Sequence, residues 1–273
     1  MKSLGNTGSE MDKELKKLIR PNDDKKLVQT ILDIGAAMMR CGAECSRVED
    51  SLFRMCKSYG FIRYDIFALP SNIQVTIELT PGNIHTQIRN IDYTSNDFST
   101  LDALNNLSRF VCANTPDAGE LLLRFEEIIS NQQHKPHRRY LGGILGVAGF
   151  AIFFGGNFAD AVAGAIVSAL IIFLSSKFSE SESNPMIYNF AISLVAELAI
   201  IILTMVGIGE NTGSITIGVV MLIVSGIGVM NGMRDMIHKD IMSGVINVTN
   251  AVLGAVGIAA GIALPILLLK GVL

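Results

Sequence analysis

The sequence predicts an α+β domain of order ααβββαα, followed by an α-helical transmembrane bundle of about five helices. Charge is divided unevenly along the 273 residues: 1–139 hold 18 basic and 18 acidic residues, whereas 140–273 hold 4 and 7. The second part is instead dense in Ile, Val, Leu, Ala and Gly, far from the roughly one-quarter charged composition of a soluble domain. The apolar periodicity of the first part changes from helical to alternating and back, which is typical of an α+β fold.

The composition also excludes several classes of protein and site. Neither part has a basic surplus, so no nucleic-acid partner is expected. The four cysteines form no C-x-x-C pair and the four histidines are scattered, whereas a zinc site needs about four clustered ligands. We therefore expect no metal and no cofactor. The first residues contain no apolar run of the kind found in a secretory signal, so the first part is expected in the cytosol.

The beginning of the chain predicts a tail and then two helices. Residues 1–24 are polar and predict a flexible N-terminal tail, and the cytosolic α+β domain is expected over residues 25–131. The Asn-Asp-Asp sequence at 22–24 is typical of a helix start. Apolar residues then recur at helical spacing in two runs that Gly42 separates and Gly60 ends: Leu27, Ile31, Ile34 and Met38, then Val48, Leu52, Met55 and Tyr59.

The middle of the domain predicts a three-stranded antiparallel meander. Residues 61–69 are rich in aromatic and β-branched side chains, and Pro-containing turn sequences separate the three strands. Residues 73–79 and 84–88 alternate apolar and polar side chains, as expected of strands with one covered face. Two helices complete the domain, near 97–112 and 117–131.

Residues 132–139 (QQHKPHRR) form a basic linker before the transmembrane domain, residues 140–273. A membrane-spanning helix needs about 20 apolar residues. Five apolar segments meet or approach this length, the first being the short one: about 141–155, 158–175, 185–207, 214–230 and 244–269.

The basic residues near the segment ends predict an orientation, because Lys and Arg concentrate on the cytosolic side. With a cytosolic N-terminus and five crossings, six of them fall on that side: Lys135, Arg138, Arg139, Lys177, Arg234 and Lys239. We therefore expect a multi-pass protein of the cell (inner) membrane, embedded in lipid, with its C-terminus outside or in the periplasm.

Ionisable residues at membrane depth are costly and are therefore candidates for function. Glu197 lies midway along the third segment and predicts a transport or proton-relay group. The alternative is a bonded structural carboxyl. Asp160, near the outer end of the second segment, is a further candidate, and a solvated helix cap fits it equally well.

The fifth segment carries a stripe of small and polar residues. Their spacings of 4, 3, 4, 3 and 4 place them on one helix face: Ser243, Asn247, Asn250, Gly254, Gly257 and Gly261. Small residues let helices approach closely, and asparagine bonds across helix interfaces. Packing is therefore the first explanation of the glycines, whereas for Asn247 and Asn250 lining a polar transport path is a close second to packing.

A polar stretch after the fourth segment predicts a cytosolic gate or substrate contact. It contains Asn231, Arg234, Asp235 and Asp240. Glycines just before it loosen the helix, and a broken helix exposes backbone groups that bind substrates or ions. Arg234 has the geometry to bind a carboxylate through two hydrogen bonds. The alternative is an anchoring arginine with Asp235 as its surface partner.

These residues resemble the threonine/serine exporter family. The resemblance rests on residues 42–49 (GAECSRVE), on Pro70 before a strand, and on the stretch 231–240 followed by Ser243 and Gly244. It extends from about residue 27 to 268. Ser225 stands where many members have proline before a glycine, so the resemblance leaves open how sharply the fourth segment is broken.

The resemblance implies a cytosolic domain followed by a membrane bundle. Some members are long chains with ten predicted spans that export threonine and serine. In others the work is split between a longer subunit and a membrane partner of about four spans, and small dicarboxylates such as succinate are exported. This chain looks like the longer, N-terminal-type subunit, which implies that partner, a homo-oligomer, or both.

The cytosolic-domain motif contributes Gly42, Glu44, Arg47 and Glu49 as candidate residues. The resemblance implies a hydrolase-like domain, but the residues give no support for catalysis. The sequence has no G-x-S-x-G elbow and no phosphate-binding loop. We expect Glu44 and Glu49 on the exposed face or in the N-terminal turn of the second helix, and we do not expect an enzyme.

Two functions follow from these features. The first is a secondary transporter subunit that exports threonine, serine or a dicarboxylate, with Glu197 as its proton or substrate group. The second is a membrane-tethered sensor or scaffold whose cytosolic domain binds a ligand or a partner. The acidic residue at membrane depth and the polar stripe favour the transporter.

Overall fold

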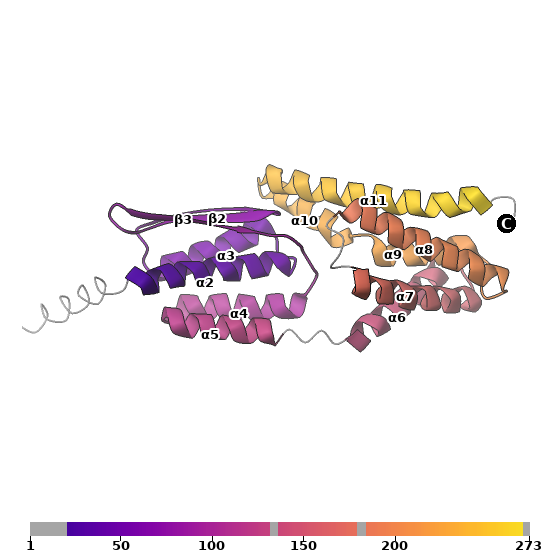
Figure 1. Ribbon diagram of the computed structural model, residues 1–273, viewed down its shortest axis with the longest axis horizontal. Coiled ribbons are helices and arrows are strands. Elements are labelled where there is room, and N and C mark those ends of the chain that lie inside the picture. The colour runs from indigo at the N-terminus through magenta and orange to yellow at the C-terminus, as the bar shows by residue number, and fades with distance from the viewer. Residues whose placement is uncertain (1–20, 132–135, 179–183, 270–273) are drawn as a thin grey trace, which may run out of the picture. The chain divides into compact units, whose positions relative to one another are not determined.

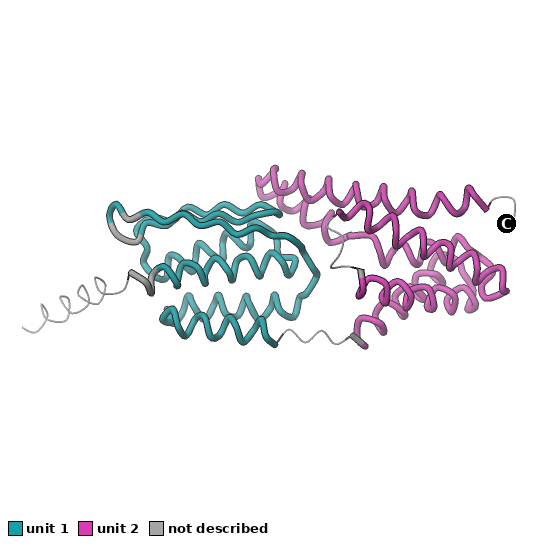
Figure 2. Tube along the Cα trace, in the orientation of Figure 1, with its two compact units in different colours: residues 1–132 teal, residues 133–273 magenta. Residues whose placement is uncertain are grey.

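The computed structural model describes residues 21–131, 136–178 and 184–269. The chain divides into two compact units (Figure 2), Met1–Gln132 as unit 1 and Gln133–Leu273 as unit 2. The first described helix, α2, spans Pro21–Arg40, so the last four residues of the predicted tail are helical. The rest of that tail, Lys135 and the other residues of 132–135 lie outside the described residues.

Unit 1 has three layers (Figure 1). A sheet lies against one side of α2 and α3 (Cys45–Ser58), and helices α4 (Phe98–Asn114) and α5 (Ala118–Ser130) lie against the other. Within the described residues, the order of elements confirms the predicted ααβββαα arrangement. The central position of α2 explains its burial, because a helix covered on both sides is apolar around more of its circumference. Val28, Leu32 and Met39 are buried in addition to the predicted stripe.

The sheet is the predicted antiparallel meander. Its strands are β1 (Arg63–Leu69), β2 (Asn72–Thr80) and β3 (Asn83–Asn90), hydrogen-bonded in the order β1-β2-β3. On β2 the alternation predicts the covered face correctly, since Ile73 and Ile77 are fully buried.

Strand β3 departs from its own alternation. Its Ile84 and Ile88 are exposed, whereas His85, Gln87 and Arg89 are half-buried. The pairing register determines this, because these three polar residues lie opposite the buried Ile77, Val75 and Ile73 of β2 and so share their face. The outer face of the sheet therefore carries isoleucine side chains.

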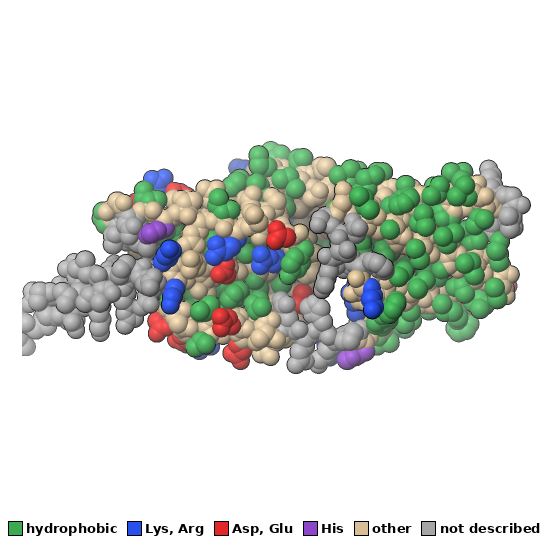
Figure 3. Space-filling model, in the orientation of Figure 1, with side chains coloured by type: hydrophobic (Ala, Val, Ile, Leu, Met, Phe, Trp, Pro, Cys, Tyr) green, Lys and Arg blue, Asp and Glu red, His purple; other side chains and the backbone are tan. Residues whose placement is uncertain are grey.

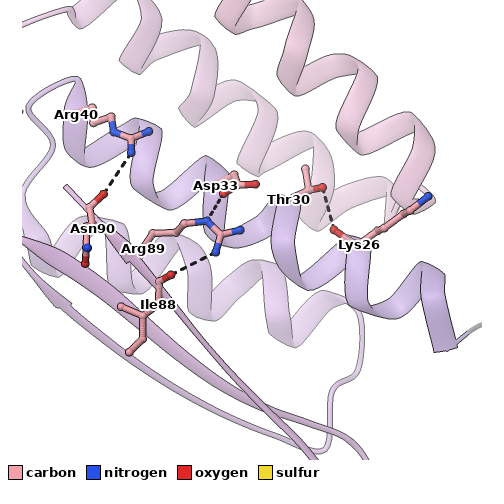
Figure 4. A network of polar contacts seen from close by, with 7 residues as sticks. All are labelled: Lys26, Thr30, Asp33, Arg40, Ile88, Arg89 and Asn90. Atoms are coloured by element: carbon pink, nitrogen blue, oxygen red, sulfur yellow. Dashed lines mark hydrogen bonds and ion pairs between the residues drawn. The ribbon is translucent and has the colours of Figure 1, made fainter. Parts of the chain in front are cut away.

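Polar contacts join the covered face of β3 to α2 (Figure 4). The guanidinium of Arg89 donates to the Asp33 carboxylate over 2.6 Å, and Arg40 donates to the backbone oxygen of Asn90 over 3.3 Å. Both side chains of the ion pair remain about one-third exposed, so we assign it only about 0–1 kcal/mol. It explains why a polar strand face is tolerated against a helix.

Unit 2 consists of six helices within the described residues. They are α6 (Pro136–Phe153), α7 (Phe158–Phe178), α8 (Pro185–Met205), α9 (Thr212–Ile223), α10 (Gly226–Ile237) and α11 (Ile241–Leu269). Buried branched side chains of α6 to α9, among them Val167, Ile200 and Ile215, form its core. Large apolar side chains also cover the visible surface of this unit (Figure 3), and Phe158 is 81% exposed. Such a surface is suited to lipid rather than to water.

Three of these helices are long and apolar enough to cross a membrane. They are Phe158–Lys177, Pro185–Met205 and Ile241–Leu269, and the pair α9 and α10 passes the same test when taken together. The described helices thus supply three spans, or up to four, whereas the sequence predicts about five. The difference lies in α6, which the sequence already marks as short and which begins inside the predicted basic linker.

The predicted fourth segment, 214–230, is two helices bent by 52°. Val224 adopts an extended conformation between them, and Ser225 is the residue before α10. The break therefore occurs without proline. Residues 231–237, which the sequence places beyond the helix end, instead continue α10 in its new direction.

Candidate functional site

Glu197 lies inside unit 2, on the covered face of α8. Its side chain is 2% exposed, and its Oε2 accepts a hydrogen bond from the Thr216 hydroxyl of α9 over 2.9 Å. Neighbours on the same face of α8, Ala196 and Ile200, belong to the apolar core. The structure thus places this carboxyl between two helices, with a side-chain hydroxyl as a hydrogen-bond partner.

Asp160, in the first turn of α7, has a different environment. It is 1% exposed, and its two oxygens accept backbone N–H groups of Asn157 (2.8 Å), Glu210 (2.7 Å) and Asn211 (2.9 Å). The Asn157 side-chain oxygen in turn accepts from the Asp160 N–H over 2.9 Å. The carboxylate therefore connects the α6–α7 turn to the α8–α9 loop. It is a buried cap rather than a solvated one.

The polar stretch after α9 brings two of the predicted groups together. Asp235, on α10, is fully buried, and its Oδ2 accepts from the Asn247 side chain of α11 over 3.2 Å. Asp240 caps the start of α11 by accepting from the Ser243 N–H over 3.1 Å. Arg234 is exposed on α10. The structure thus joins a gate candidate to a residue of the α11 stripe.

A close crossing of α10 and α11 supports this contact. A Cβ at Gly232 would lie 3.0 Å from the backbone oxygen of Gly244, and one at Gly244 would lie 2.6 Å from that of Gly232. Only glycine allows the two backbones this approach. Our reading of the sequence did not assign Gly232, although two glycines on either side of a short connection are a recognisable signal.

The stripe on α11 packs against two helices, α10 and α8. Gly254, Gly257 and Gly261 are buried, and a Cβ on any of them would meet the first half of α8. Asn250 is exposed and Asn247 is half-buried. The six residues share a helix face, but α10 covers its beginning and α8 its later part, so that Asn250 falls between the two.

Unit 2 also contains a cavity of about 270 Å³. Four helices contribute polar groups or apolar walls to it, and the polar residues in its lining are Arg139, Ser175, Tyr188 and Asn189. The sequence patterns do not single out Ser175, Tyr188 and Asn189, and they mark Arg139 only as part of the linker and of the orientation signal. The only sequence signal is that these polar residues lie in the end turns of otherwise apolar helices.

The motif of unit 1 has a structural role. Gly42 adopts a φ of +89°, and a Cβ there would lie 2.8 Å from the Ser95 backbone oxygen. Glu49 accepts from the Ala68 N–H of β1 over 2.8 Å, which joins α3 to the sheet. Glu44, at the position before α3, is buried rather than on an exposed face, whereas Arg47 is exposed.

The thiols of unit 1 are not arranged for metal binding. Within the described ranges, no group of three or more His, Cys, Asp or Glu side chains is placed to hold a metal. Burial, with a contribution from the nearby Asp97 charge, raises the pKa of Cys41 to about 11, and burial raises the pKa of Cys56 to about 12. Both thiols are therefore protonated at neutral pH.

Comparison with known protein families identifies a match to most of the chain. The family model ThrE, described as "Putative threonine/serine exporter", matches residues 29–269. No significant match was found among curated proteins or solved structures.

Proposed function

Because the chain belongs to the threonine/serine exporter family, we propose that it is a secondary transporter, or a subunit of one, that exports small carboxylate-bearing metabolites. The family and the apolar helices make it a membrane protein of the exporter type. Threonine and serine are the first proposed substrates, and a dicarboxylate such as succinate is the alternative. An ion gradient is the proposed source of energy.

The observation that carries the proposal is the Glu197–Thr216 pair. An ionisable side chain inside a membrane bundle is costly unless it has a function or many partners. Of the three buried carboxyls in the described part of unit 2, Asp235 belongs to the α10–α11 contact, and the other two, Asp160 and Glu197, differ in this respect. Asp160 accepts three backbone N–H groups, which fits a fixed structural anion, whereas Glu197 accepts from one rotatable hydroxyl. We therefore assign the proton or substrate role to Glu197 and a structural role to Asp160.

The inner gate of the proposal is the region around the α9–α10 break. Discontinuous helices at membrane depth are typical of transporter binding sites. The 52° bend is followed by the buried Asp235–Asn247 contact. Asn231, Arg234 and Asp240 extend this gate in our proposal. Asn250, exposed on α11, lines the path together with Asn247 or contacts a neighbouring subunit.

The surroundings of the bundle are also part of the proposal. We propose a cell (inner) membrane location with unit 1 in the cytosol, five crossings of which the short α6 is the first, and the C-terminus on the other side. A small membrane partner of about four spans, a second copy of this chain, or both complete the transport path. Unit 1 regulates or assembles the complex.

The sensor or scaffold function remains the second candidate. The observation that favours it is that unit 1 has a hydrophobic core of its own, with fully buried residues such as Leu52 and Leu104. A domain with its own core is suited to bind a ligand or a partner independently of transport.

The test measures export in cells that carry defined variants. Deletion of the protein is expected to retain threonine, serine or succinate inside loaded cells. Glu197→Gln is expected to abolish export at unchanged membrane abundance. Glu126→Gln, the same change at an exposed position of α5, serves as the control and is expected to export normally. Unchanged export by Glu197→Gln would refute the role of this carboxyl. Unchanged pools after deletion would favour the sensor.

A further inference from the structure

The cavity of unit 2 lies where the ends of four helices meet. Its lining comes from the first half of α6 and α8 and from the second half of α7 and α9. These helix ends include Arg138, Arg139 and Lys177, the residues that predict the cytosolic side. The volume of about 270 Å³ is near the lower limit of about 300 Å³ for ligand pockets. The cavity is therefore suited to a small metabolite.

The lining combines one cation with a few neutral polar groups and an apolar wall. Arg139 supplies a guanidinium, whose planar donors match a carboxylate in two parallel hydrogen bonds. Within the described residues, this guanidinium has no hydrogen-bond or ion-pair partner. Ser175, Tyr188 and Asn189 supply hydroxyl and amide groups, and isoleucine and leucine side chains form the remainder. Few polar groups in an apolar pocket are the usual pattern of a specific ligand site.

The cavity is aligned with the Glu197–Thr216 pair along two helices. On α8, eight residues separate Asn189 from Glu197, or about 12 Å at the helical rise of about 1.5 Å per residue. On α9, seven residues separate Ile223 from Thr216, or about 10 Å. The same helix pair thus leads from the cavity to the buried carboxyl.

We propose that this cavity is a binding site for a small carboxylate-bearing metabolite, with its carboxylate on Arg139 and its second polar group among Ser175, Tyr188 and Asn189. The inference rests on the proposed export function and deepens it by locating the first binding site. The apolar wall limits the ligand to a short carbon skeleton, as in a small amino acid or a short dicarboxylate.

The test compares two neighbouring arginines in the purified full-length protein. Binding of radiolabelled threonine, serine and succinate is measured by equilibrium dialysis in lipid nanodiscs. Arg139→Gln is expected to weaken binding of one of these ligands about tenfold or more, because it removes a charge-assisted pair. Arg138→Gln removes the same charge from the adjacent position, which does not line the cavity, and is expected to bind normally.

A second variant separates ligand binding from folding and orientation. Asn189→Leu keeps a similar side-chain volume and leaves the charge unchanged, but it removes a polar group from the cavity lining. It is expected to weaken binding while elution on size-exclusion chromatography stays unchanged. Equal binding by the wild type, Arg139→Gln and Asn189→Leu would overturn the inference. A wild-type protein that exports in cells but binds none of the three probes would also overturn it and leave the proposed function standing. A protein that neither exports nor binds them would overturn both.

Discussion

The crossing of α8 and α11 provides a quantitative test of how unit 2 is packed. Gly261 is the perturbed residue, since its missing side chain lets α11 approach α8. A Cβ there would lie 2.5 Å from the backbone oxygen of Phe190 and 3.0 Å from the backbone nitrogen of Leu194. Ordinary contact begins near 3.4 Å, so Gly261→Ala requires the helices to separate locally by about 0.9 Å. Overpacking of this kind costs about 1–3 kcal/mol.

The matched control removes the effect of helix propensity. Gly146 lies on α6, and a Cβ there has no neighbour within 4 Å among the described residues. Both substitutions replace glycine by the better helix former, a gain of up to about 1 kcal/mol in each case. The difference between the two variants therefore measures the crossing alone, and we expect Gly261→Ala to be about 1–3 kcal/mol less stable than Gly146→Ala.

The assay is reversible unfolding in mixed micelles, with dodecyl sulfate as denaturant and helicity as the signal. The two variants and the wild type are compared at constant total detergent. Equal midpoints for Gly261→Ala and Gly146→Ala would refute the close approach of α8 and α11. That result would also remove helix packing as the explanation of the glycines in the stripe.

Three further predictions concern two hydrogen bonds and one buried thiol. Thr216→Val is expected to reduce export and to lower stability by about 0.6 kcal/mol, at most about 1.7. Thr204→Val is the control, since among the described residues its hydroxyl bonds the backbone of its own helix alone, and it is expected to leave export unchanged. Equal export by the two variants would contradict the role of the pair. Glu49→Ala removes the acceptor for a β1 N–H and is expected to destabilise unit 1 by about 1–3 kcal/mol, seen as faster hydrogen exchange of the β1 amides in the full chain; unchanged exchange would count against this contact. Burial raises the pKa of Cys56 from 9.0 to about 12, so above pH 9 the unfolded state loses its proton first and stability is expected to fall as pH rises toward 12. Maleimide labelling read by mass spectrometry should accordingly modify the exposed Cys112 before Cys56, and equal labelling of both would oppose this view.

The sequence predicts the fold of unit 1 well where a pattern is local. Helical spacing and alternation are local properties, so the order of helices and strands follows from them. The face of β3 does not, because it depends on pairing with β2 and on the Arg89–Asp33 contact, which joins residues 56 positions apart. The glycines before the polar stretch indicate a loosened helix, but the 52° bend between α9 and α10 does not follow from hydropathy, since residues 214–230 are apolar on both sides of it.

The candidate site, too, is predictable from the sequence only where the signal is local. The burial of Glu197 follows from its place midway along an apolar segment. The environment of Asp160 does not, because two of its three donors, Glu210 and Asn211, are 50 and 51 residues away. The cavity is least predictable, as it requires the ends of four helices to meet around Arg139.

The Asp160 cap has a mechanical consequence for the transport cycle. It holds the α6–α7 turn to the α8–α9 loop. Separating them would break the hydrogen bonds from the Glu210 and Asn211 N–H groups to this carboxylate, which are worth about 1.5–3 kcal/mol each as bonds to a charged group. We therefore expect the end of the bundle that contains the α6–α7 turn and the α8–α9 loop to stay closed during transport. The 52° bend at Val224 and Ser225 follows α9 and lies at the opposite end of that helix from this contact. We expect α6 to α9 to move apart at that other end, where α9 is followed by the bend.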